Sequence, residues 1–278
     1  MSVHNINVLS GPDCQMLIDR IRRTLVAVKP SVLSNINAYP KPFPANDQVI
    51  FEYLVLAVFS NQTKWKFLKP HLPEIKNALF NYNINLIAAL SDIAVHQIYM
   101  QKIYRLKIPS GIKIEKKLLW IRNNASTFLK IQKQFGSVLN FMQTELAGSP
   151  FDDIHNCYIH PNDKQLLKHF SKGMFKLGGV GDAICCEFFN GIGIDEFKPD
   201  VHTCRFIKRI GIVPSGNKDK VREAGITIAR TLGQPRKYVD SHLWIFCADG
   251  EGEICTEKTP QCHVCQLKNI QPQLCAWC

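Results

Sequence analysis

Apolar side chains recur every three or four residues along most of the chain, the period of an amphipathic α-helix. After Ser10, the residues Leu17, Ile21, Leu25 and Val28 follow this spacing. A serine before such a pattern is a typical helix start, because its side-chain oxygen accepts from the free N–H groups of the first turn. The pattern therefore predicts a helix that begins just after Ser10.

Further segments show the same helical period. They are residues 118–135, 164–170, 221–232 and 238–248. In contrast, Val49 to Phe59 is apolar on most faces, which is typical of a central helix buried on all sides. Convincing alternation with a period of two, the signature of strands, is missing. The sequence therefore predicts an all-α fold.

The composition is that of an ordinary globular protein, with 46% hydrophobic and 21% charged residues among 278. This length suits one large domain or two small ones. An excess of 34 Lys+Arg over 23 Asp+Glu gives a net charge of +11, which favours a polyanionic partner. Charge alone does not separate nucleic acid from an acidic membrane surface.

The sequence gives no sign of a membrane or secretory protein. The best apolar stretch, residues 53–59, is far too short to cross a membrane, and the N-terminus lacks the pattern of a signal peptide. We therefore expect a cytoplasmic protein without a membrane partner, in a compartment where thiols stay reduced. Five of the eleven cysteines fall in the last 24 residues, and such clustering predicts a metal or cluster site.

One segment is dense in cations: Lys102, Arg105, Lys107, Lys113, Lys116, Lys117 and Arg122. Such a run is either a solvated face or a nucleic-acid contact, and the sequence leaves both interpretations open.

A tight glycine turn, LGGVGDA, occupies residues 177–183. A Walker phosphate loop would need a lysine after the last glycine, and none is there. A dinucleotide fingerprint would need a third glycine after a strand, but Ile184 stands at that position and the preceding segment looks helical. Asp200 does lie at about the distance of a ribose-binding acid, so this alternative has some support.

A helix-hairpin-helix fits the turn better. Its glycines, Gly179 and Gly181, would let backbone N–H groups approach a phosphate at the start of the next helix. Val180 would pack into the core. The structural alternative is a plain helix–helix connection with a glycine cap.

In combination, the motifs resemble the helix-hairpin-helix DNA glycosylases of the endonuclease III superfamily. Those proteins carry Leu-Pro-Gly-Val-Gly, then a helix, then an aspartate in a Val-Asp-x-His context. This chain has Leu177-Gly-Gly-Val-Gly181 followed by Pro199-Asp200-Val-His202, with Arg205 also in the family's place. The combination of hairpin, aspartate and cysteines is specific, whereas each part alone is not.

The resemblance extends upstream and covers most of the chain, from about Val49 to Cys265. Ser60-Asn-Gln62-Thr63 resembles the end of the family's apolar helix. Arg122-Asn-Asn-Ala125 is similar to its Arg-x-Lys-Ala segment, with Asn124 in place of the lysine.

The resemblance implies a two-lobed helical fold. Residues 49–195 would form a central domain, a six-helix barrel that carries the hairpin. Residues 1–48 and 196–278 would together form the second domain, which holds a C-terminal metal-cluster loop.

The resemblance also implies roles for individual residues. Asp200 would be the catalytic carboxylate, which stabilises positive charge on the sugar and activates water. The alternative for Asp200 is a structural helix N-cap. Gln62 would fill the gap left by the extruded base, and His202 would support substrate or DNA binding. Gly179, Val180 and Gly181 of the hairpin would bind DNA.

Family members that also cut the DNA backbone carry a lysine two residues after the last glycine, whose amine forms a Schiff base with the sugar. Here that position is Ala183, which has no nucleophile. The resemblance therefore implies a monofunctional enzyme that uses water and leaves an abasic site.

The spacing of Cys255, Cys262 and Cys265 matches the family's [4Fe–4S] module, and Cys275 would be the fourth ligand. The family's fourth cysteine falls earlier, where this chain has Gln271. The rival is a structural zinc site, in which Cys262 and Cys265 pair with Cys275 and Cys278. That site would leave Cys255 as a spectator.

The predicted function is therefore that of a monomeric, monofunctional DNA glycosylase that acts on double-stranded DNA in base excision repair. The alternative is a non-catalytic DNA-binding protein that keeps the hairpin and the metal module. The sequence leaves the excised base open among damaged, mismatched and modified bases.

Overall fold

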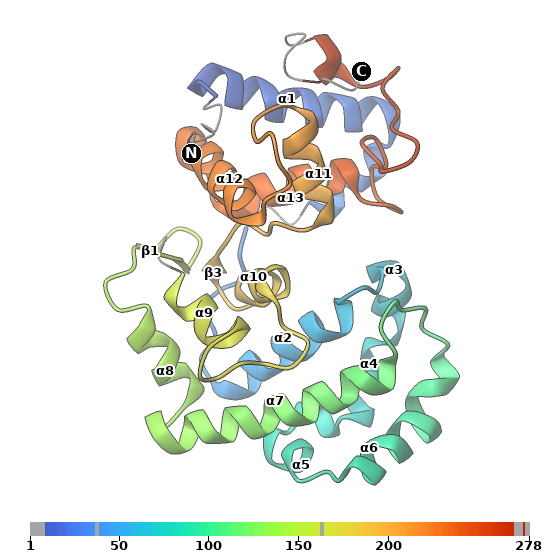
Figure 1. Cartoon of the computed structure of the whole chain (residues 1–278), viewed down its shortest axis with the longest axis vertical. Helices are drawn as coiled ribbons and strands as arrows, with labels where there is room; N and C mark the ends of the chain where they lie inside the picture. Colours follow the sequence, from blue (N-terminus) through green and yellow to red (C-terminus); the bar gives the residue numbers. More distant parts are fainter. Residues whose placement is uncertain (1–8, 37–38, 162–163, 270–274, 276–278) are drawn as a thin grey trace. The chain divides into compact units, whose positions relative to one another are not determined.

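The computed structural model describes the chain except for residues 1–8, 37–38, 162–163, 270–274 and 276–278. The chain divides into two compact units, one made of residues 1–40 with 195–278 and the other of residues 41–194. Each unit has its own apolar core, so the N-terminal segment packs with the C-terminal part of the chain (Figure 1).

The second unit, residues 41–194, is built around α2 (Asp47–Ser60), whose apolar residues are buried on all faces. The longest described helix, α7 (Ile114–Phe135), packs against α2, as do α8 (Val138–Glu145) and α10 (Asp182–Gly191). The other helices of this unit are α3 (Trp65–Leu68), α4 (Leu72–Ala78), α5 (Ile84–Ala88), α6 (Asp92–Ile98) and α9 (Gln165–Ser171).

The first unit packs α1 (Gly11–Val28) against α12 (Lys218–Leu232) and α13 (Arg236–Cys247). Helix α11 (Val201–Arg209) also contacts α12 and α13. At the start of α1, the Ser10 side chain accepts from the N–H of Asp13, which satisfies one free donor of the first turn. The predicted serine cap is therefore confirmed.

The helices predicted from periodicity are all present, and the all-α class is confirmed. The sequence did not reveal a small sheet, in the order β1 (Phe151–Asp152), β2 (Cys157–Ile159), β3 (Ile194–Asp195). These strands have two or three residues each, too few for a pattern of period two to be recognised. None of the described helices is long and apolar enough to span a membrane.

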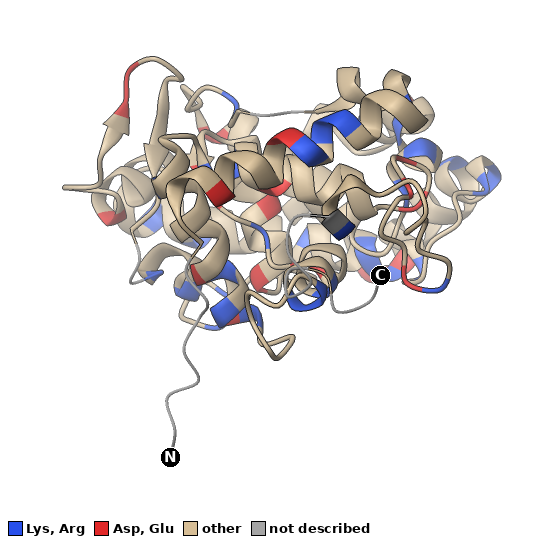
Figure 2. Ribbon diagram, turned by 90° about the horizontal axis from the view of Figure 1, so that it is seen from above, with Lys and Arg blue, Asp and Glu red and all other residues tan. Residues whose placement is uncertain are grey.

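Lys and Arg residues are distributed over many helices and loops and are not confined to one element (Figure 2). The charge of +11 therefore does not by itself mark a binding surface. The local environment of each cation decides which of them can meet a partner.

Candidate functional site

Asp200 lies directly before α11 in the first unit and caps that helix. Its Oδ1 accepts from the N–H groups of His202 at 2.8 Å and Thr203 at 3.0 Å. The Thr203 hydroxyl accepts in return from the N–H of Asp200 at 3.0 Å, which completes a capping box. The structural role weighed from the sequence is therefore real.

The cap uses only one oxygen of the carboxylate. Oδ2 takes no part in it, and the ammonium of Lys198 lies 3.8 Å from this oxygen. The side chain is 14% exposed, so it is sheltered but still reachable. The same residue can thus anchor the helix with Oδ1 and present Oδ2 to a ligand.

His202, in the first turn of α11, is held as a neutral imidazole. Its Nδ1 lies 3.1 Å from a guanidinium nitrogen of Arg205, and because arginine can only donate, Nδ1 must accept. Burial lowers the pKa of His202, which agrees with this assignment. Arg205 also donates to the carbonyl of Cys247, the last residue of α13, and to that of Cys255. It thereby ties α11 to α13 and to the cysteine loop, which begins at Cys255.

In the second unit, the glycine turn connects α9 to α10 as a hairpin, and its shape depends on glycine. Gly179 has a φ of +73°, and a Cβ there would lie 2.4 Å from the ring of Trp120. Trp120 also packs on Gly178, so its ring lies against the backbone of the turn. Val180 is 3% exposed and packs in the core, as the pattern predicts.

The hairpin leaves donors at the start of α10. Within the described part of the chain, the N–H groups of Gly179 and Gly181 have no protein acceptor. A Cβ at Gly181 would meet nothing within 4 Å, so the backbone faces open space there. Such N–H groups at a helix N-terminus can bind an anion.

Asn124 holds the hairpin from α7. Its side chain accepts from the N–H of Gly178 at 2.6 Å and donates to the carbonyl of the same residue at 3.1 Å. This pair of hydrogen bonds gives a structural reason for an asparagine at the position where the family pattern has a lysine.

Gln62 lies in the tight turn that follows α2, in the same unit as the hairpin. Its backbone is left-handed, with a φ of +54°, and its carbonyl accepts from the N–H of Gly111 at 2.9 Å. The neighbouring Asn61 donates from its side chain to the carbonyl of Gly179 at 3.0 Å. The structure therefore connects the Gln62 turn directly to the hairpin.

The cation-rich segment between residues 102 and 122 is not one uniform face. Lys117 is fully buried, and Arg122 pairs with Asp92. Lys113 and Lys116 are exposed at the start of α7, and Lys116 lies over the Trp120 ring at 5.2 Å.

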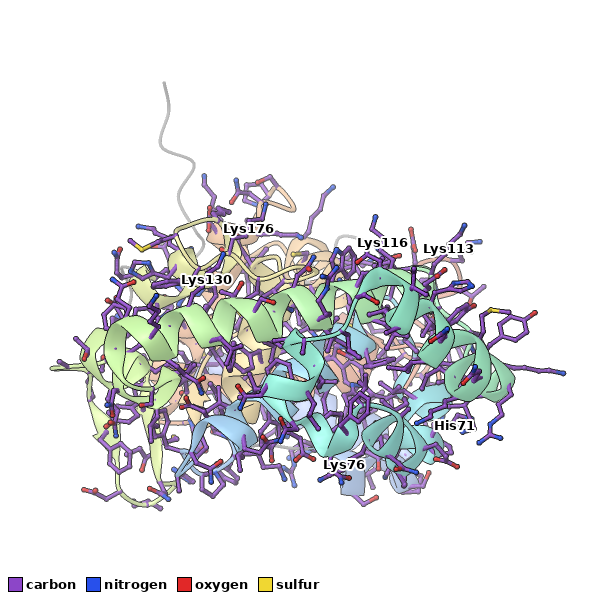
Figure 3. The ribbon with its side chains drawn as sticks, turned by 90° about the horizontal axis from the view of Figure 1, so that it is seen from below. His71, Lys76, Lys113, Lys116, Lys130 and Lys176 are labelled. Atoms are coloured by element: carbon purple, nitrogen blue, oxygen red, sulfur yellow. The ribbon has the colours of Figure 1, made fainter. Side chains whose placement is uncertain are left out.

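Four exposed lysines of the second unit lie on the same side of it in Figure 3. They are Lys113, directly before α7, Lys116 and Lys130 of α7, and Lys176, which precedes the glycine turn. Lys76 and His71 lie on the opposite side.

Sequence reasoning missed Lys117, which contacts the Gln62 turn. A signal was present, because Ile114, Lys117, Ile121 and Phe128 occupy one helical stripe, so the lysine falls on a buried face. The interpretation of Lys117 as one of the surface cations was wrong, since its side chain lies inside the core.

In the first unit, the cysteines proposed as metal ligands line one cavity of about 20 Å³, together with Arg209. They are Cys255, Cys262, Cys265 and Cys275. Arg209 donates to the Cys255 Sγ at 3.3 Å and to three backbone carbonyls of the same loop. A hydrogen bond from Cys247, together with Arg209, lowers the pKa of Cys255.

The cysteines of this loop do not form a ready-made chelate. In the part of the chain that the structure describes, no group of three or more His, Cys, Asp or Glu side chains is arranged to hold a metal ion. Cys262 is disulfide-bonded, so it would have to be reduced to serve as a ligand. Cys278, a ligand of the rival zinc site, lies outside the described residues.

The solved structure of an endonuclease III chain has the same type of fold as this chain. The endonuclease III chain of a trapped covalent intermediate with DNA is 15% identical, with a TM-score of 0.59, and the match covers 95% of this chain and 97% of that one. A 3-methyladenine DNA glycosylase I from Staphylococcus aureus is 19% identical, with a TM-score of 0.46, and the match covers 63% of this chain and 93% of that one. No curated protein matches the sequence.

The family model for methyladenine glycosylase matches residues 39–206, more than half of the chain. The matched region contains the Gln62 turn, the hairpin and Asp200, and it ends before the cysteine loop. The chain therefore belongs to the methyladenine glycosylase family of helix-hairpin-helix DNA glycosylases.

Proposed function

We propose that this glycosylase hydrolyses the N-glycosidic bond of a methylated adenine in double-stranded DNA and leaves an abasic site. Family membership supports the substrate class. The observation that carries the mechanism is the divided use of the Asp200 carboxylate, whose Oδ1 caps α11 while Oδ2 stays outside the cap.

The chemistry suits a carboxylate. Cleavage of an N-glycosidic bond builds positive charge on the deoxyribose, and an ionised oxygen beside that charge stabilises the transition state. A purine methylated at a ring nitrogen already carries positive charge, so it can leave without being protonated first. The tasks left to the protein are to extrude the nucleotide, hold Asp200 against the sugar and admit one water.

For DNA binding, we propose that the hairpin at Gly179, Val180 and Gly181 binds a phosphate through the N–H groups of its two glycines, since the N–H of Val180 donates to the carbonyl of Leu177. The exposed Lys113 and Lys116 extend this contact along the backbone. Gln62 enters the gap left by the extruded nucleotide. His202 donates to DNA from Nε2, because its other ring nitrogen is engaged by Arg205.

We further propose that the enzyme is monofunctional. Ala183 follows the hairpin where a Schiff-base lysine would stand. Lys117 is an unsuitable nucleophile, because it is fully buried and all three of its N–H groups are used. Borohydride reduction of reaction mixtures tests this, and we expect no covalent protein–DNA product. A trapped product would overturn the monofunctional proposal.

We propose that the cysteine loop, with Cys262 reduced, holds a [4Fe–4S] cluster through Cys255, Cys262, Cys265 and Cys275, because these four cysteines line the same cavity. A cavity of about 20 Å³ has room for little more than one water, so the loop would have to open to take up the cluster. When bound, the cluster would stabilise the loop by cross-linking its cysteines.

Metal analysis and an absorption spectrum of protein purified without oxygen test this proposal. We expect iron and sulfide with a broad visible band. One zinc per chain and a colourless protein would favour the zinc alternative. Purified protein that contains neither iron nor zinc would contradict both the cluster and the zinc alternative.

The activity is tested by incubating the purified protein with duplexes that each carry one altered base, and identifying released bases by mass spectrometry. We expect a methylated adenine to be released and uracil to be retained. Tight DNA binding without release of any base would instead support the non-catalytic alternative.

A further inference from the structure

We propose that Lys117 is the positioning residue of the Gln62 turn: its buried ammonium holds two backbone carbonyls before Gln62 and the Thr63 hydroxyl after it, and so controls extrusion of the base rather than cleavage of the glycosidic bond. This inference rests on the proposed function and deepens it, because it names a residue that prepares the DNA for the chemistry at Asp200.

The ammonium of Lys117 has an unusual environment. The residue is 0% exposed, and its three N–H groups meet three oxygens: the carbonyl of Phe59 at 2.7 Å, the carbonyl of Asn61 at 2.5 Å and the hydroxyl of Thr63 at 2.6 Å. Within the described ranges, no carboxylate forms an ion pair with it. A buried charge that meets only neutral acceptors is costly.

All three acceptors belong to the end of α2 and the turn that carries Gln62. They belong to residues 59, 61 and 63, so the ammonium bonds to residues on both sides of Gln62 in the sequence. The carbonyl of Gln62 itself is held separately, by the N–H of Gly111. Every residue from Asn61 to Thr63 is therefore fixed through one of its oxygens.

Gln62 needs this support because its backbone is left-handed, with a φ of +54°. A residue with a Cβ persists in that region only where the surroundings over-determine it. Gly111 also leaves room for the side chain, since a Cβ at that position would lie 2.6 Å from Gln62 Oε1. The Gln62 turn therefore has a strained backbone that contacts with Lys117 and Gly111 stabilise. Such stabilisation is expected where a side chain must keep one orientation.

The hydrogen bonds around Lys117 also extend to the hairpin. Asn61 accepts from Lys117 with its carbonyl and donates to the carbonyl of Gly179 with its side chain. The Thr63 hydroxyl, which Lys117 also contacts, donates to Ser110 at 2.8 Å. Lys117 is therefore the shared anchor of two loops and, through Asn61, of the hairpin.

A lysine is the side chain that satisfies this site. Three acceptors converge on one point, and an ammonium offers three donors from one atom. Methionine would fill the volume but leave two carbonyls and a hydroxyl without a donor. Burial lowers the pKa of Lys117 to about 8, so the ammonium is still the main form at neutral pH.

The experiment compares single-turnover base release from two substrates. In the first, the altered base is paired within an intact duplex, so release requires the Gln62 wedge. In the second, the same base faces a one-nucleotide gap and leaves the stack without it. Lys117→Met is measured beside Gln62→Ala, the double variant and Lys133→Met, an exposed lysine of the same helix that serves as control.

We expect Lys117→Met to lose about tenfold or more in rate on the intact duplex and less than about twofold on the gapped substrate. In the double variant, Lys117→Met should add little to the loss caused by Gln62→Ala, because both remove one function. Lys133→Met should match the wild type. If Lys117→Met does not fold, Thr63→Val, which removes one acceptor and keeps the shape, should show the same substrate dependence more weakly.

Equal losses on both substrates, or losses by Lys117→Met and Gln62→Ala that multiply in the double variant, would overturn the proposal. Failure of the proposed function gives a different result, since the wild type would then release no base from either substrate.

Discussion

The surroundings of Asp200 and of Gln62 are built in opposite ways. Asp200 owes its position to a capping box whose partners lie within three residues. Gln62 owes its position to Gly111, Lys117 and, through its neighbour Asn61, to Gly179, which is 118 residues away from that asparagine. One site is local, whereas the other exists only once three distant segments have packed together.

This difference assigns separate tasks to the two regions. A locally capped carboxylate is fixed as soon as α11 forms, which suits a group that must meet the sugar in a constant orientation. An assembled, strained turn depends on the integrity of the whole second unit. Substitutions far from Gln62 should therefore affect it, whereas Asp200 should respond chiefly to changes in its own turn.

The largest expected effect is a loss of stability in the second unit, caused by a substitution in the hairpin. Gly179→Ala forces a Cβ into a backbone with a φ of +73° and against the Trp120 ring. We expect the free energy of unfolding to fall by about 2 to 4 kcal/mol, from left-handed strain and overpacking together.

Gly181→Ala is the matched control, because its Cβ meets nothing within 4 Å. Urea denaturation of both variants measures the difference. Equal stability of Gly179→Ala and the wild type would contradict the packing described for the hairpin.

The second prediction concerns pH. The pKa of Lys117 falls from 10.5 in the unfolded chain to about 8 in the folded protein. Between these values the unfolded chain holds a proton that the folded chain has released, so stability rises with pH. The gain should be about 3 kcal/mol.

The measurement is the free energy of unfolding from pH 7 to 10.5 for the wild type and Lys117→Met. Their difference should change across this window, whereas Lys133→Met should follow the wild type throughout. A constant difference between the wild type and Lys117→Met would show that the ammonium is not desolvated.

A smaller loss is expected at the joint between α7 and the hairpin. Asn124→Ala removes the two hydrogen bonds to Gly178 and leaves the N–H and the carbonyl of that residue without their partner. We expect a loss of about 1 to 2 kcal/mol in stability. Asn123→Ala, at the exposed neighbouring position, should change stability by less than about 0.5 kcal/mol. Thermal unfolding of the pair tests this.

The smallest effect is electrostatic. Replacing Lys113 and Lys116 together by alanine should reduce the dependence of DNA affinity on salt by about two ions, with little change in stability. Lys76→Ala is the control, because Lys76 lies on the opposite side in Figure 3. A double variant that keeps the salt slope of the wild type would place the DNA elsewhere.

The same contrast explains how far the sequence could be interpreted. The helices, the buried α2 and the cap-forming position of Asp200 follow from residues that are close in the chain, so periodicity and capping preferences predicted them. The two-residue strands β1 and β3 carry no periodic signal. The bond from Asn61 to Gly179 has no local signature either, because its partners are 118 residues apart.

Lys117 shows where the interpretation went wrong and why. Counted with its neighbours, it belonged to a run of cations, and such runs are usually solvated. Its position in the apolar stripe of α7 indicates burial, but the density of cations around it is the more conspicuous pattern in the sequence. Only the packed structure shows the three oxygens that make a buried ammonium tolerable there.

In the proposed mechanism the Asp200 carboxylate stabilises the sugar cation, and Asp200→Asn removes that charge without changing the shape of the side chain. Asparagine caps helices as well as aspartate does, so folding should be preserved, as thermal unfolding can verify. On a duplex that carries a methylated adenine, we expect single-turnover base release by Asp200→Asn to fall by about 100-fold or more relative to the wild type. Base release by folded Asp200→Asn at the wild-type rate would contradict it.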